Sequence, residues 1–106
     1  MGNSMEVPQS VLLMGQDNTK KPTFNIAYDI PKSEPFFQYV QKCILTIYEK
    51  ATVNPQKIKN KTGYFEVKYV DEFGSEILVF SKKNGEGNFT HEKCYSVMQK
   101  IKRTVR

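Results

Sequence analysis

The segment "SEPFFQYVQKCILTIYEK", Ser33–Lys50, decides the fold, because it carries the strongest helix signal in the chain. Its apolar side chains recur every three or four residues, as one face of an α-helix requires. Ser33 can cap the first free amides, Glu34 suits the positive end of the helix dipole, and Pro35 is tolerated in the first turn. The apolar face consists of Phe36, Phe37, Val40, Cys43, Ile44, Ile47 and Tyr48. We predict one long amphipathic helix that ends near Lys50.

Apolar segments on both sides of this helix predict the strands that it covers. Thr23–Asp29 alternates between apolar and polar residues, and Ser10–Gly15 is a short apolar run that we expect to pair with it as a hairpin. After the helix, Gly63–Val70 and Glu76–Phe80 flank the sequence "DEFGSE". Gly74 in this sequence supplies the positive φ that a tight turn needs. We therefore predict a second hairpin here.

The remaining segments complete one α+β domain. The basic segment Ala51–Gly63 contains Pro55 and is predicted to be a connection. Thr90 can cap a second, C-terminal helix, and the last residues fit either the end of this helix or a final strand. We expect a flexible tail over residues 1–9 and a single two-layer domain over residues 10–106. The predicted core is Leu12, Phe24, Ile26, Phe37, Val40, Ile44, Ile47, Phe65, Val67, Ile77, Val79, Val97 and Ile101.

Composition fits a small folded protein. The 106 residues are 39% hydrophobic and 12% aromatic, which is enough for one buried core. The net charge of +5, from 16 basic and 11 acidic residues, suits anionic partners but also plain solubility. Because the sequence has neither a membrane-spanning apolar stretch nor a secretory pattern, we expect a soluble protein of the cytoplasm, with the nucleus as the alternative, and no membrane partner.

The sequence does not suggest enzyme chemistry. The single histidine, His91, and the two cysteines, Cys43 and Cys94, do not have metal-ligand spacing. Both cysteines fall on predicted apolar helix faces, so we expect buried reduced thiols, with a single disulfide as the alternative. No glycine-rich phosphate loop and no paired nucleophile and base are visible. We predict a protein that is not an enzyme, with no cofactor, no metal site and no small-molecule substrate.

The charged residues are unevenly placed along the chain. Acids gather between Glu66 and Glu76, whereas lysines gather before the first long helix, after it and near the C-terminus. Opposite charges on separate patches can join copies of a protein head to tail, with the acidic patch of one copy on the basic patch of the next. Alternatively, these charges belong to ordinary turns exposed to water. The candidate partner-binding residues are the basic Lys20, Lys21, Lys57, Lys59 and Lys61 and the acidic Asp71, Glu72 and Glu76.

The segment Tyr69–Ile77, "YVDEFGSEI", resembles the acidic hairpin of a Phox-and-Bem-one (PB-one) domain, and Lys20–Lys21 stands where that family carries a basic cluster. This chain departs from the family pattern at Phe73 and Ser75, where acids are usual. The resemblance implies a ubiquitin-like β-grasp fold, with a four- to five-stranded mixed sheet whose first strand is central and parallel to the last. It also implies an adaptor, scaffold or oligomerisation domain that binds another protein domain or a second copy.

Two other functions remain open from the sequence. Lysines near aromatic residues also suit a small basic nucleic-acid-binding domain, with cations on phosphates and rings under bases. The sequence is equally compatible with a small inhibitor or adaptor that binds a partner through a sheet edge. Direct binding of mixed-sequence RNA or DNA would distinguish the nucleic-acid function from the other two.

Overall fold

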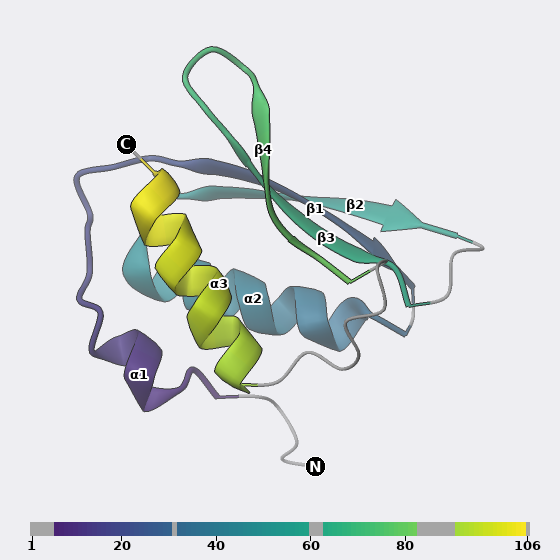
Figure 1. The fold of residues 1–106 in the computed structure, drawn as a ribbon, viewed down its shortest axis with the longest axis horizontal. Helices are drawn as coiled ribbons and strands as arrows, with labels where there is room; N and C mark the ends of the chain where they lie inside the picture. The colour runs from purple at the N-terminus through teal and green to yellow at the C-terminus, as the bar shows by residue number, and fades with distance from the viewer. Residues whose placement is uncertain (1–5, 31, 60–62, 83–90, 106) are drawn as a thin grey trace.

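The structure, a computed structural model, describes residues 6–30, 32–59, 63–82 and 91–105. It has two layers, a four-stranded sheet and a layer of helices that covers one face of it (Figure 1). This arrangement confirms the predicted two-layer α+β fold. The elements in chain order are α1 (Gln9–Leu12), β1 (Thr23–Asp29), α2 (Glu34–Ile47), β2 (Thr52–Ile58), β3 (Phe65–Val70), β4 (Glu76–Ser81) and α3 (His91–Thr104).

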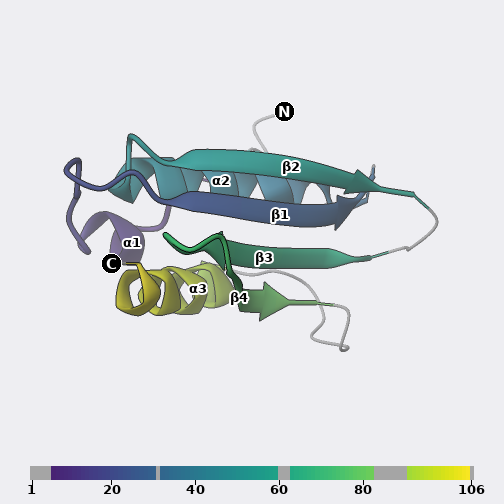
Figure 2. The ribbon, with the colours of Figure 1, turned by 90° about the horizontal axis from the view of Figure 1, so that it is seen from above.

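The sheet is mixed and has the strand order β2-β1-β3-β4 (Figure 2). β1 pairs in parallel with β2 and antiparallel with β3, which in turn pairs antiparallel with β4. The first strand therefore lies inside the sheet, and α2 is the crossover that its parallel neighbour requires. The parallel partner of β1 is the next strand along the chain and not the last one. The first-with-last pairing that the β-grasp resemblance implies is not observed.

The predicted first strand, Ser10–Gly15, is wrong, because the first half of this segment belongs to the short helix α1. Its apolar residues follow a helical spacing: Val11 is fully buried and Met14, three residues later, packs against the core. Leu12 and Leu13 are instead 48% and 76% exposed. The segment does not pair with β1, so the predicted N-terminal hairpin does not form.

The predicted connection Ala51–Gly63 is also wrong in part, because it contains β2. Pro55 is tolerated because β2 is an edge strand and the missing N–H of Pro55 faces outward. The amide of Thr52 donates to the carbonyl of Pro22 over 2.9 Å, so the even-numbered residues of β2 direct their backbone groups toward β1. Pro55 has the opposite parity and costs the sheet no hydrogen bond.

The core lies between the sheet and the helices. The ring of Tyr28 in β1 stacks on Phe37 of α2 with centroids 4.6 Å apart, and Phe24 and Phe65 on the inner strands are fully buried as well. The core prediction is wrong for two residues, since Leu12 is 48% and Ile77 39% exposed. The other predicted core residues are buried. Of the two structures expected for the last residues, the end of a helix or a final strand, the helix is correct, because α3 continues to Thr104.

Two neighbouring residues of α2 test this packing. Ile44 is fully buried, whereas Leu45 is 37% exposed on the outer side of the same helix. We expect Ile44→Ala to lower the free energy of unfolding by about 2–5 kcal/mol, because it leaves a cavity in the core. The control Leu45→Ala should cost less than about 1 kcal/mol. Urea denaturation measures both, and equal losses for the two variants would contradict the assignment of the helix faces.

Candidate functional site

The sheet face that the helices leave open carries a polar network across all four strands. The side-chain amide of Asn54 on β2 donates to the side-chain oxygen Oδ1 of Asn25 on β1 (3.0 Å), and the side-chain amide of Asn25 donates to the carboxylate of Glu76 on β4 (2.8 Å). The second oxygen of Glu76 lies 3.7 Å from the ammonium nitrogen of Lys68 on β3. These side chains therefore link both edges of the sheet through its two inner strands.

A buried carboxylate completes this network. Glu66 is 4% exposed and accepts hydrogen bonds from the hydroxyls of Tyr64 (2.9 Å) and Ser81 (3.3 Å). Lys68 also lies 3.7 Å from Glu66, so it stands between two carboxylates. Burial raises the pKa of Tyr64, and its hydrogen bond to Glu66 acts in the same direction. The positive charge of Lys68 is thus compensated within the chain and is a poor anchor for an anionic ligand.

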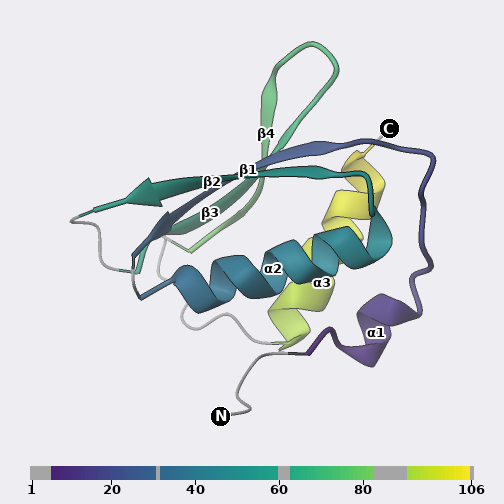
Figure 3. The ribbon, with the colours of Figure 1, turned by 180° about the vertical axis from the view of Figure 1, so that it is seen from behind.

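The turn between β3 and β4 is fixed by its own hydrogen bonds. One carboxylate oxygen of Asp71 accepts the amides of Phe73 (2.9 Å) and Ser75 (2.8 Å), and the Gly74 amide donates to the Asp71 carbonyl (3.0 Å). Gly74 has φ +82°, as the sequence predicts for this position. Figures 1 and 3 show that the hairpin rises from the sheet on the side away from the helices.

This turn presents an apolar surface that we call the hairpin patch, formed by Phe73 and Ile77, whereas Leu78 lies on the opposite face of β4 beside Lys68. Phe73 is 86% exposed, and Ile77 and Leu78 on β4 are 39% and 45% exposed. A cavity of about 250 Å³ lies beside the turn and is lined by Tyr69, Asp71, Glu72, Phe73, Ile77 and Thr104. In the sequence, Phe73 stands out only as a departure from an acidic pattern. The signal that marks this surface is an aromatic residue inside a tight turn, where its side chain cannot reach the core.

The three acidic candidates have different roles in the structure. Asp71 builds the turn, and Glu76 bonds Asn25 and faces Lys68 across the strands. Glu72 is exposed at the tip of the hairpin. Of the predicted acidic set, Glu72 is therefore the residue best placed to meet a partner.

The basic candidates lie at two ends of the sheet. Lys20 and Lys21 precede β1, and the pairing of Thr23 with Val70 places them at the same end as the β3–β4 turn. Lys57 and Lys59 lie at the other end, near the close of β2, and Lys61 is outside the described residues. The acidic turn and the first basic pair thus share one end of the molecule instead of occupying separate poles.

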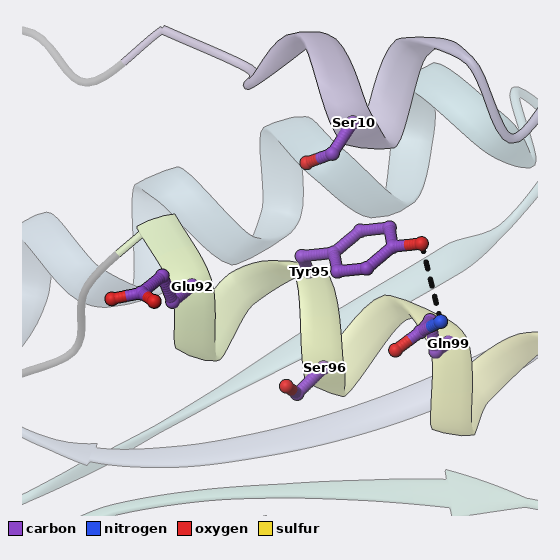
Figure 4. A pocket seen from close by; sticks show the side chains of 5 residues that line it. All are labelled: Ser10, Glu92, Tyr95, Ser96 and Gln99. Atoms are coloured by element: carbon purple, nitrogen blue, oxygen red, sulfur yellow. Dashed lines mark hydrogen bonds between the residues drawn. The ribbon is translucent and has the colours of Figure 1, made fainter.

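A second cavity, of about 400 Å³, lies between α1 and α3 (Figure 4). Its lining consists of Ser10, Glu92, Tyr95, Ser96 and Gln99, and Gln99 donates to the Tyr95 hydroxyl over 3.2 Å. The lining holds one carboxylate and three hydroxyls, without a second acid or base to form a proton-transfer pair. Within the described ranges, no three His, Cys, Asp or Glu side chains gather as metal ligands.

No protein-family model, curated protein or solved structure matches this chain. The PB-one resemblance therefore stays a prediction. In the part of the chain that the structure describes, every helix is too short or too polar to cross a bilayer.

Asp71 offers a direct test of how the turn is held. Asp71→Ala removes the acceptor of two amides, so we expect faster hydrogen exchange at Phe73 and Ser75 and a loss of about 1 kcal/mol in unfolding free energy. Asp71→Asn keeps a carbonyl acceptor and should remain close to the parent. Glu72→Ala is the control for loss of charge at the tip. If Glu72→Ala loosens the turn as much as Asp71→Ala, the carboxylate of Asp71 does not hold it.

Proposed function

We propose that this chain is a protein–protein interaction module that binds a second copy of itself through the β3–β4 hairpin. The observation that carries the proposal is the 86% exposed Phe73 on a turn fixed by Asp71. A large aromatic side chain on a rigid turn loses little conformational entropy when a partner covers it. Such residues are typical anchors at the centre of protein interfaces.

The free edge of β4 supports the same surface. The amide of Asp71 donates to the carbonyl of Ser75 over 2.9 Å, which makes these two a hydrogen-bonded pair of the antiparallel ladder. Bonded pairs alternate along such a ladder, so Glu76 and Leu78 direct their backbone groups away from β3. β4 contains no proline, unlike the opposite edge β2 with its outward-facing Pro55. β4 is therefore the edge better suited to pairing with a strand of a partner.

The charges near the hairpin favour a second copy as the partner. In a two-fold interface the same surface meets itself, so any charges around the hairpin patch have to include both signs. Glu72 at the tip shares its end of the sheet with Lys20 and Lys21. Two identical β4 edges related by a two-fold axis run antiparallel, which suits extension of the sheet across both copies.

The nucleic-acid alternative has less support. The aromatic side chains Phe24, Tyr28 and Phe65 of the inner strands are buried on the helix side and cannot stack on bases. On the open face, Lys68 is flanked by Glu66 and Glu76, whose charge would repel phosphates.

Self-association can be tested directly with the double variant Phe73→Ser, Ile77→Lys, which changes both residues of the hairpin patch. We expect the parent to dimerise as its concentration rises from about 1 µM to about 1 mM. The dimer dissociation constant of the variant should be at least about tenfold higher. Sedimentation velocity measures both. Leu13→Ser is the matched control, because Leu13 is 76% exposed at the C-cap of α1, outside the hairpin patch.

Two results would contradict this proposal. One is a parent chain that stays monomeric over the whole concentration range. The other is a Leu13→Ser variant that loses dimer as the hairpin variant does. Micromolar binding of mixed-sequence RNA by a monomeric parent would favour the nucleic-acid alternative.

A further inference from the structure

Two cysteines from different helices touch inside the core. The sulfur of Cys43 on α2 lies 2.9 Å from the sulfur of Cys94 on α3. Cys43 is fully buried and Cys94 is 1% exposed. We propose that this pair is an oxidative modification site, at which an intramolecular disulfide joins α2 to α3. This proposal is independent of the hairpin surface.

The geometry of the helix layer favours this bond. A disulfide needs two Cβ atoms within a few ångströms and side chains that point toward each other, and few residue pairs in a folded chain satisfy both conditions. The contact between the Cys43 and Cys94 sulfurs meets the requirement that the side chains converge, so the helices already hold the sulfurs together. The two residues are 51 positions apart in sequence. A bond between such distant positions restricts the unfolded chain strongly, so it should stabilise the fold.

The surroundings make the two sulfurs unequal. The hydrogen bond between them raises the pKa of Cys43, and burial acts in the same direction. The same hydrogen bond lowers the pKa of Cys94 against the opposing effect of burial, and a hydrogen bond from Tyr39 lowers it further. Cys94 therefore has the greater thiolate character and is the better nucleophile for thiol–disulfide exchange.

The reaction needs an oxidant, for which a low-molecular-weight disulfide such as oxidised glutathione suffices. The Cys94 thiolate attacks one sulfur of the reagent, forms a mixed disulfide and releases the first reagent thiol. Cys43 then gives up its proton and attacks the Cys94 sulfur, which forms the Cys43–Cys94 bond and releases the second reagent thiol. Two electrons pass from the protein to the reagent, and the two protein thiol protons balance those of the two released thiols.

Burial controls the rate of this reaction. A reagent of this size cannot reach sulfurs that are at most 1% exposed, so exchange requires the α2–α3 contact to open. We expect oxidation to speed up in denaturant concentrations below the unfolding transition. Once formed, the bond should resist reductant under native conditions for the same reason.

The test uses the unmodified chain equilibrated with oxidised and reduced glutathione. After an acid quench and alkylation in denaturant, intact mass should show the loss of two hydrogens and no alkylated cysteine. The oxidised protein should melt at least about 10 °C above the same protein in reductant. Added reductant in denaturant should reverse both changes.

The deciding comparison, oxidised against reduced parent, needs no variant. Cys43→Ala is the chemical control, since it leaves Cys94 without an intramolecular partner and should show no rise in melting temperature on oxidation. The proposal is overturned if both cysteines of the treated parent are alkylated, if they carry only glutathione, or if they link separate chains. It is equally overturned if the disulfide forms without raising the melting temperature.

Discussion

The packing of α2 against the two inner strands is the constraint on which the rest of this structure depends. α2 buries Phe37, Val40 and Ile44 against β1 and β3, whose own aromatic residues point toward it. The same helix is the crossover that returns the chain to lie parallel to β1. One amphipathic segment therefore both covers the sheet and determines which strand follows on which side.

Because the helices cover only one face, the other face has to satisfy its polar groups by itself. The chain of contacts from Asn54 through Asn25 and Glu76 to Lys68 does this in water, without help from a second layer. It also ties the polar edge strand β2, which buries little apolar surface, to the rest of the sheet. Side-chain bonds thus replace part of the stability that burial supplies on the helix side.

The elements with strong periodicity could be predicted from sequence, and those without it could not. Helix α2, strand β1 and the β3–β4 hairpin follow from spacing and from Gly74 in the turn. Helix α1 was missed because the apolar run that holds it leaves Leu13 in solvent, and β2 because it is polar and contains Pro55. Strand order depends on pairings between distant segments, which local patterns do not encode.

The candidate site, like the fold, combines features that the sequence predicts with features that depend on contacts between distant residues. The charged residues of the hairpin were visible in the sequence, but whether Asp71 meets a partner or holds the turn depends on its backbone neighbours. Both cysteines were expected on apolar helix faces, yet only the packing angle of α2 and α3 brings the sulfurs of Cys43 and Cys94 together. Sequence identified the faces, and the tertiary arrangement decided which of them meet.

The hairpin register contains a shift between Val67 and Lys68, where β4 holds one residue more than β3. The extra residue is Val79, and it allows Val79 and Phe80 to pack inward one after the other. Beyond it the pairing with β3 continues in the same order, so Leu78 lies beside Lys68 and Ile77 beside Tyr69. The bulge thus lets β4 insert a second core side chain while the outer hairpin keeps the two faces that a strand without Val79 would present.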